Sequence, residues 1–169
     1  KGCSSLSSII LPNNLTSIGM ETFEGCSSLS SIILPNNLTS IEDSVFKGCS
    51  NLTSIVLPNK LKEINEFAFA LCENLVTINI VDSLREISYT AFLGCYKLES
   101  ITISEKNENF KLYNGILYNS YFTRIVIVTS LSGNVTLHEN IRYIKEKLFY
   151  GQSKITTINF STELIGIGE

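Results

Sequence analysis

The sequence is short of the residues that most enzymes and nucleic-acid-binding proteins use. It has no tryptophan and one histidine, and its 13 Lys and Arg are outnumbered by 16 Asp and Glu. Without a basic excess, nucleic acid is not an expected partner. No glycine-rich phosphate loop occurs, and His138 has no cysteine, serine or carboxylate pair recurring near it. We therefore predict no enzymatic activity, no catalytic residue, no cofactor and no metal site.

Long hydrophobic runs are also missing. No apolar run approaches the about 18 residues needed to cross a bilayer, so no membrane span is expected in this segment. The chain begins at Lys1 without a signal peptide, and both of its ends fall inside a repeat. Repeat arrays need polar caps on their terminal coils. We therefore expect an uncapped fragment of a longer protein.

What the sequence does contain is a repeat of 23 residues. Cysteine recurs at this spacing, at Cys3, Cys26, Cys49, Cys72 and Cys95. Each cysteine is followed by an L-x-x-I-x-L or L-x-x-I-x-I phrase, such as Leu52, Ile55 and Leu57 after Cys49. A fixed period of about 20–29 residues that carries this phrase is typical of leucine-rich repeats. The predicted fold is a right-handed, β-dominated leucine-rich-repeat solenoid.

Each coil has three predicted segments. Residues 29–34 are rich in β-branched residues and alternate at their end, which predicts a strand of a parallel sheet on the concave face. After a Pro-Asn-Asn turn, residues 38–41 form a short second strand, and residues 42–48 form a single helical turn that ends at Gly48. Stacking predicts ladders of like residues, and one such ladder comprises Phe23, Phe46, Phe69, Phe92 and Phe149.

The period breaks once, because 34 residues separate Ile103 from its equivalent Leu137. The extra residues include Asn114-Gly115 between apolar runs, a strong β-hairpin signal. A third apolar run, 125–128, follows. We interpret residues 1–169 as a single domain: regular coils over about 3–103, a hairpin insertion and adapted coil over about 104–134, and resumed repeats over about 135–169.

These residues resemble the BspA-like, or Treponema pallidum-type, leucine-rich repeats. The family pattern is approximately L-x-x-I-x-L-P-x-x-L-x-x-I-G-x-x-A-F-x-x-C. The coil from Leu52 matches it with Ile55, Leu57, Pro58, Leu61, Ile64, Ala68, Phe69 and Cys72. The insertion is similar to a family variant, N-x-x-F…x-G-x-L-Y, in residues Asn107, Phe110, Gly115, Leu117 and Tyr118.

The resemblance implies a non-catalytic, protein-binding repeat domain of a cell-surface or secreted antigen. Such proteins adhere to host cells or extracellular matrix, so the implied partner is a host cell-surface or extracellular-matrix protein. The alternative is an intracellular or structural leucine-rich-repeat scaffold that could self-associate. The five cysteines lack the close spacing of zinc ligands, and we interpret them as small buried hydrophobic residues, with disulfides as the alternative.

Three sets of residues are candidate sites. The concave face of a solenoid is its usual binding surface. Its outward residues are Ser8, Ile10, Ser31, Ile33, Ser54, Val56, Thr77, Asn79, Ser100 and Thr102. The insertion concentrates aromatic residues that either contact a partner or pack the hairpin, namely Phe110, Tyr113, Tyr118, Tyr121 and Phe122. Five N-x-S/T sequons could carry N-linked glycans, at Asn14, Asn37, Asn51, Asn134 and Asn159.

Overall fold

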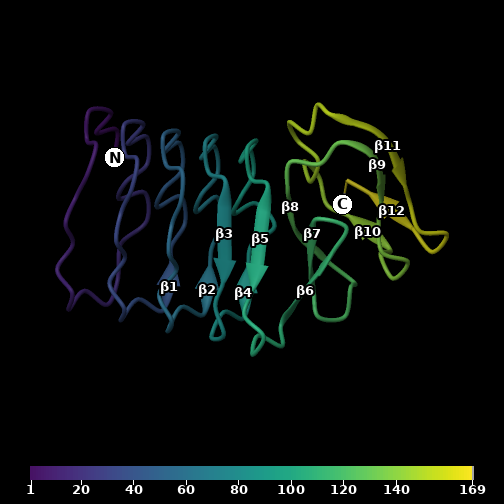
Figure 1. Ribbon diagram of the computed structural model, residues 1–169, viewed down its shortest axis with the longest axis horizontal. Helices are drawn as coiled ribbons and strands as arrows, with labels where there is room; N and C mark the ends of the chain where they lie inside the picture. Colours follow the sequence, from purple (N-terminus) through teal and green to yellow (C-terminus); the bar gives the residue numbers. More distant parts are fainter. Residues whose placement is uncertain (169) are drawn as a thin grey trace.

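The computed structural model describes residues 1–168 and shows a β-solenoid of about 6 turns. In Figure 1 the coils of the first 103 residues stand side by side, from purple to teal. The green segment that follows leaves this stack, and the yellow C-terminal coils lie beyond it. The 23-residue period therefore corresponds to one turn of the solenoid, as predicted.

Two parallel ladders run along the regular coils. The second strands pair in the order β1 (Ser40–Ile41), β2 (Glu63–Ile64) and β4 (Glu86–Ile87). The first strands pair as β3 (Thr77–Ile80) with β5 (Ser100–Ile103), and earlier coils join them through single bridges such as Ile33 to Val56. Partners along both ladders are 23 residues apart, so identical positions lie above one another.

The third side of each coil differs from the prediction. Within residues 1–168 there is no helix, and the expected helical turns are hydrogen-bonded turns. The N–H groups of Phe46 and Gly48 bond to carbonyls of the next coil at 2.8 Å, while the Lys47 N–H bonds back to Ser44 at 3.2 Å. A helix would instead direct each N–H four residues back. The positive φ of Ser44, 57°, is also non-helical. Coil-to-coil bonding therefore replaces the helical turn.

The core of the regular coils consists of stacked identical residues. Phe23, Phe46, Phe69 and Phe92 form a continuous stack, with successive ring centroids 5.5, 5.3 and 5.2 Å apart. Phe149 was predicted to continue this stack but lies in a separate hydrophobic cluster. The prediction was wrong because Val126 and Ile127 of the insertion join the core of the regular coils, while Phe149 of the resumed repeat packs in the other cluster.

The insertion is a three-stranded antiparallel sheet. The predicted hairpin is confirmed: β6 (Phe110–Tyr113) and β7 (Ile116–Asn119) are joined by Asn114 and Gly115, both with positive φ. The third run is β8 (Ile125–Val128), which pairs with the other edge of β7. Repeats resume with β9 (Gly133–Thr136) paired to β11 (Ile155–Asn159), and β10 (Tyr143–Ile144) paired to β12 (Gly166–Ile167).

One buried side chain fastens the insertion to the regular coils. The amide nitrogen of Asn107 donates to the carbonyls of Val81 at 2.7 Å and Leu84 at 2.9 Å. Its side-chain oxygen accepts the N–H of Asn109 at 2.9 Å. Asn107 is 5% exposed, so these three bonds replace contacts that water would otherwise make. The turn that starts the insertion is thereby anchored to the coil that contains β3 and β4.

Candidate protein-binding surface

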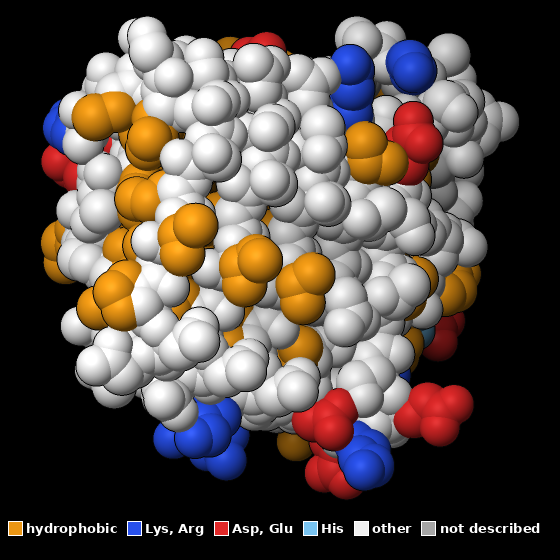
Figure 2. All heavy atoms as spheres, turned by 60° about the vertical axis from the view of Figure 1, so that its left-hand side comes forward, with side chains coloured by type: hydrophobic (Ala, Val, Ile, Leu, Met, Phe, Trp, Pro, Cys, Tyr) orange, Lys and Arg blue, Asp and Glu red, His pale blue; other side chains and the backbone are white. Residues whose placement is uncertain are grey.

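The outward side of the first strands, here called the first-strand face, carries a stripe of aliphatic side chains. Ile10, Ile33 and Val56 are 96%, 85% and 79% exposed. Their neighbours Ile32 and Leu34 are buried, as the two-residue alternation of a strand requires. Figure 2 shows hydrophobic side chains standing among uncharged ones on one face, with charged groups at its margins. The stripe is therefore open to a partner.

The rest of the first-strand face is polar and uncharged. Beyond the stripe, Asn79 and Thr102 continue the same row, and the Thr102 hydroxyl donates to the Asn79 amide oxygen at 2.8 Å. All ten residues predicted for this face are exposed, including the hydroxyl row of Ser8, Ser31, Ser54, Thr77 and Ser100. The structure thus brings together an apolar strip and a parallel strip of hydroxyl groups, a combination that suits protein contact.

The aromatic residues of the insertion separate into two groups. Phe110 and Tyr118 are 1% and 0% exposed, so they pack the hairpin and cannot contact a partner. Both residues were candidate partner contacts, and this prediction is wrong for them because both side chains point from the hairpin into the interior. Tyr121 is 76% exposed and Tyr113 is 38% exposed, while Phe122 is half-buried. Tyr121 is therefore the most accessible aromatic side chain of the set.

His138 belongs to a cluster of rings around the insertion. Its ring stacks on Phe122 with centroids 4.0 Å apart, and Tyr113 meets it edge-on at 5.3 Å. The His138 N–H of the backbone donates to the Tyr118 hydroxyl at 3.3 Å, and its Nδ1 accepts the N–H of Asn140 at 3.2 Å. Burial raises the pKa of Tyr118 to about 12. These contacts hold the insertion on the resumed repeat.

The cysteines lie where small interior residues are needed. Cys26, Cys49, Cys72 and Cys95 are buried and Cys3 is exposed, and all five are free thiols. The Cys49 Sγ donates to the carbonyl of Phe23 at 3.2 Å, and the next two cysteines repeat this contact one coil further on. Burial raises the pKa of Cys49 and of Cys95 to about 12. Raised pKa values keep the thiols protonated and poor as nucleophiles.

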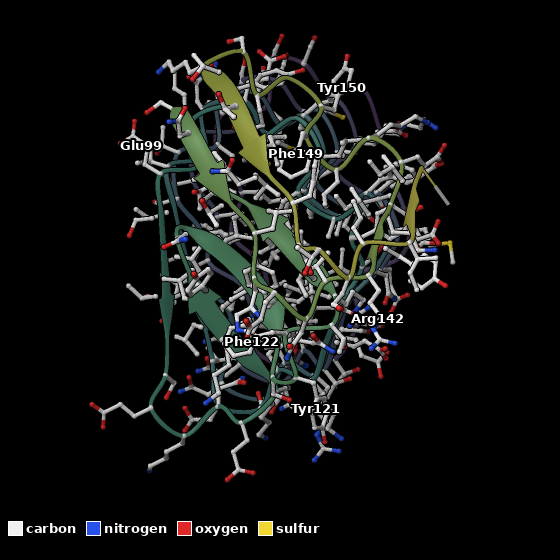
Figure 3. The ribbon with its side chains drawn as sticks, turned by 90° about the vertical axis from the view of Figure 1, so that its right-hand side faces the viewer. Glu99, Tyr121, Phe122, Arg142, Phe149 and Tyr150 are labelled. Carbon is white, nitrogen blue, oxygen red and sulfur yellow. The ribbon has the colours of Figure 1, made fainter. Side chains whose placement is uncertain are left out.

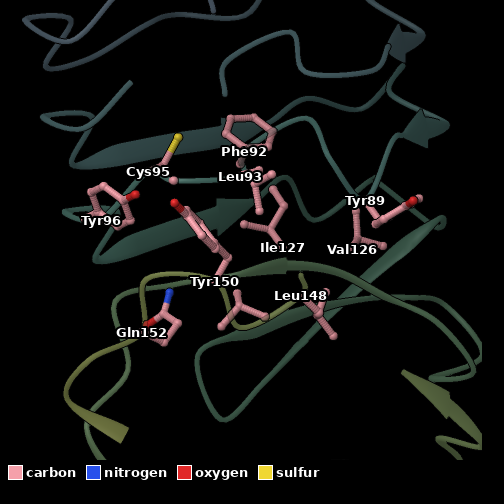
Figure 4. Close-up of a pocket in the computed structure, with 12 residues that line it drawn as sticks. Tyr89, Phe92, Leu93, Cys95, Tyr96, Val126, Ile127, Leu148, Tyr150 and Gln152 are labelled. Carbon is pink, nitrogen blue, oxygen red and sulfur yellow. The ribbon is translucent and has the colours of Figure 1, made fainter. Parts of the chain in front are cut away.

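Neither a metal centre nor a large cavity is found among these interior residues. Across residues 1–168 no three His, Cys, Asp or Glu side chains gather closely enough to hold a metal ion. A small cavity of about 20 Å³ lies where Cys95 and Tyr96 meet Tyr150 and Gln152 (Figure 4). It has room for about one water molecule. The cavity lies at the contact between the coil that contains Cys95 and the resumed repeat.

The five sequon asparagines are all on the surface. Asn14, Asn37, Asn51, Asn134 and Asn159 are each exposed. Some already take part in coil-to-coil bonds: the Lys60 ammonium donates to the Asn37 oxygen at 2.9 Å, and Asn159 donates to the Thr136 hydroxyl at 3.1 Å. Exposure is required for glycan attachment, but these bonds also give the asparagines a structural role.

The fold and surface define a leucine-rich-repeat solenoid, a class whose domains generally bind proteins. The chain belongs to the BspA type leucine-rich repeat family. The family pattern, described as a BspA type leucine rich repeat region of six copies, matches residues 1–123 and 118–169. No curated protein matches the chain. Within the described residues, no helix is long and apolar enough to span a membrane.

Solved structures share the fold. The leucine-rich repeat protein of Treponema pallidum is 25% identical with a TM-score of 0.60, and the match covers 99% of this chain and 62% of that one. A leucine-rich cell surface protein from Faecalibacterium prausnitzii is 21% identical with a TM-score of 0.76, over 99% and 52%. A leucine-rich repeat protein from Bacteroides ovatus is 21% identical with a TM-score of 0.63, and the match covers 99% of this chain and 64% of that one. The chain therefore spans about half to two thirds of these proteins.

Proposed function

We propose that the chain is a non-catalytic adhesion domain of a cell-surface or secreted antigen, and that it binds a host cell-surface or extracellular-matrix protein. The stripe formed by Ile10, Ile33 and Val56 is the observation that carries this proposal. Contiguous exposed apolar side chains on a soluble domain often mark a contact site. The stripe lies on successive coils, so its spacing is set by the rigid first-strand ladder and costs little entropy when a partner binds.

The energetics fit a hydrophobic centre with a polar rim. Fully burying one aliphatic side chain contributes roughly 1.5–3 kcal/mol, so three of them could supply a large share of a micromolar affinity, about −8 kcal/mol. The adjacent hydroxyls, such as Ser31 and Ser54, can donate and accept hydrogen bonds at the margin. The first-strand face therefore has the composition of an interface centre and its rim.

A surface location is supported by likeness alone. The family resemblance implies exported antigens, and the structural neighbour from Faecalibacterium prausnitzii is described as a cell surface protein. Another neighbour, 18% identical with a TM-score of 0.64, is described as the pneumococcal vaccine antigen PcpA. Exposed sequons would accept glycans if the parent protein passes through a eukaryotic secretory pathway.

Self-association is the second candidate function. Because the aliphatic stripe is straight and repeats from coil to coil, the same stripe on another copy could pack against it. A scaffold that pairs in this way would not need an outside partner. Light scattering measured against protein concentration separates the two: a mass that stays at that of one chain supports a foreign partner.

The test introduces negative charge into the aliphatic stripe. The double variant Ile33→Asp/Val56→Asp places two carboxylates in the proposed contact while leaving the buried residues unchanged. We expect it to bind immobilised fibronectin, laminin or host cells at least about tenfold more weakly than the wild type. The matched control is Asn36→Asp/Asn59→Asp, which adds the same charge at exposed turn positions. Equal adhesion by the folded stripe variant and the control would refute the proposal.

A further inference from the structure

A second open feature lies at the other end of the molecule, in the resumed repeats. A hollow of about 450 Å³ is lined by one residue of the β7–β8 loop, by β10 and the residues before it, and by one residue of the loop before β12. These residues are Thr123, Glu139, Asn140, Arg142, Tyr143 and Glu163. Figure 3 views this end and labels Tyr121 and Arg142 on it. We call this feature the Tyr143 hollow.

Tyr143 stands at an outward position of the second strands. The equivalent residues of the regular array, Glu63 and Glu86, are exposed as well, although they pair in register with each other. Tyr143 pairs in register with Gly166, so the same position of the next coil adds no side chain beside the ring. The Tyr143 side chain is 47% exposed.

The polar groups of the hollow are not used by one another. No ion pair within residues 1–168 involves Glu139, Arg142 or Glu163, although all three line the same space. Asn140 donates to the carbonyl of Tyr121 at 3.3 Å, which places the highly exposed Tyr121 residue at the margin. The hollow thus offers two carboxylates, one guanidinium and one amide oxygen around an aromatic ring.

We propose that the Tyr143 hollow binds a neutral glycan, one or two sugar units at a time. An aromatic ring next to open space can stack on the C–H face of a pyranose, and carboxylates accept hydrogen bonds from its hydroxyls. Arg142 adds donors for ring and hydroxyl oxygens, and the Asn140 amide oxygen adds another acceptor. Two glutamates against one arginine leave the lining net negative, which disfavours anionic sugars. The volume falls in the range of small-ligand sites.

This inference is independent of the proposed adhesion to a protein. The stripe lies on the first strands of the first three coils, whereas the hollow lies on the second-strand side of the resumed repeats. A variant at one surface leaves the other intact. Failure of sugar binding would therefore leave the first-strand proposal untouched, and the reverse also holds.

The experiment is an NMR titration of the ¹⁵N-labelled chain with N-acetylglucosamine, galactose and mannose, each added separately. We expect at least one sugar to give saturable shifts in the millimolar range, confined to amides of Thr123, Asn140, Tyr143 and Gly166. Replacing Tyr143→Ala should weaken binding at least about tenfold, while Tyr143→Phe, which keeps the ring, should lose less. Unchanged amide positions in β9 and β11 of the sugar-free variants would show that the resumed repeats remain folded.

The control is Tyr150→Ala, which removes another exposed tyrosine, 55% exposed, outside the hollow. It should bind the sugar as the wild type does. The proposal is overturned if none of the three sugars shifts these amides, or if Tyr143→Ala and Tyr150→Ala weaken binding equally.

Discussion

The two parts of the molecule bury their side chains in different ways. In the regular array, residues 1–103, a buried residue lies against copies of itself, as Phe46 does between Phe23 and Phe69. In the interrupted part, residues 104–168, four buried residues, Phe110, Leu117, Val126 and Ile127, belong to the core of the array. The rest form a separate cluster, in which Tyr118 packs with Phe122 rather than with a copy of itself. The buried members of this cluster are Ile116, Tyr118, Ile125, Val135, Leu137, Ile141 and Ile144.

The difference shows what translation along a solenoid provides. When coils repeat, one solution for packing and for backbone hydrogen bonds serves every coil, and the free positions are only the outward ones. Where the repeat is interrupted, new pairings such as β7 with β8 must be built from particular residues. Outward positions there also differ from one coil to the next, as Tyr143 and its partner Gly166 do. Repetition thus stabilises the platform, while interruption creates individual surface features.

The largest expected effect compares two phenylalanines that the sequence treats as equivalent. Phe46→Ala removes a ring that is 0% exposed and stacked on both sides, and should lower the free energy of unfolding by about 3–5 kcal/mol. Phe149→Ala removes a half-buried ring from the second cluster and should cost less than about 2 kcal/mol. Urea unfolding of both variants measures the difference. Equal losses would show that the interrupted part is packed as well as the array.

The second prediction concerns the joint between the two parts. Asn107→Ala would leave the carbonyls of Val81 and Leu84 without their donor in a buried place, a loss of about 2–3 kcal/mol. Amide hydrogen exchange of β6 should speed up as the insertion loosens. Asn79→Ala removes an exposed amide with one bond to Thr102 and should change stability by about 0.5 kcal/mol or less. If Asn107→Ala changes neither the unfolding free energy nor the amide exchange of β6, packing alone holds the insertion.

Much of the fold can be predicted from the sequence because the period and the two-residue alternation are local signals. They predict the ladders, and Asn114-Gly115 predicts the hairpin. They do not predict which edge a strand pairs with, so neither the pairing of β8 with β7 nor the break in the phenylalanine stack was foreseen. The helical turns were mispredicted because a local cap pattern does not reveal bonds to the next coil.

The candidate sites follow the same division. The exposure of Ile33 and Val56 was predictable because their buried neighbours fix which face they occupy. In the hairpin, no repeat indicates which side chains point inward, so the sequence left partner contact and packing open for its aromatic residues, and the structure buries Phe110 and Tyr118. Tyr143 carries no motif, and its exposure follows from its outward position beside the buried Ile144. The repeat does not indicate that Thr123 of the insertion and Glu163 of the next coil share a hollow with it.

The third prediction uses pH to compare the two parts. Burial raises the pKa of Cys49 and Cys95 from 9.0 to about 12 and also raises that of Cys72, all in the array. The unfolded thiols release protons first, so this stabilisation is complete below pH 9 and is lost between about pH 9 and 12. In the insertion, burial also raises the pKa of Tyr118, so its contribution to stability should be lost as the pH rises above about 10.

The measurement is urea unfolding at several alkaline pH values, with the triple variant Cys49→Ala/Cys72→Ala/Cys95→Ala as the control. The wild type should lose stability above pH 9 more steeply than the variant. In addition, Ellman's reagent at neutral pH should label Cys3 rapidly and the buried cysteines only on unfolding. Parallel pH profiles of the two proteins would remove the thiols as the cause of alkaline destabilisation.

The smallest effect tests a departure inside the array itself. Leu71 has a φ of 60° and is 38% exposed, at the position where neighbouring coils have Gly48 and Gly94 with positive φ. Its left-handed backbone conformation costs roughly 1–2 kcal/mol. Replacing it by glycine removes this strain, but glycine also increases the conformational entropy of the unfolded chain, which offsets part of the stabilisation. Leu71→Gly should therefore raise the unfolding free energy by about 0.5 kcal/mol, and Gly48→Ala should lower it by about 1 kcal/mol. Leu71 also packs over Gly94, with its Cδ2 only 2.8 Å from where a Cβ of residue 94 would lie. If Leu71→Gly instead lowers stability, this packing outweighs the strain, and the array depends on side-chain contacts even where its repeat is broken.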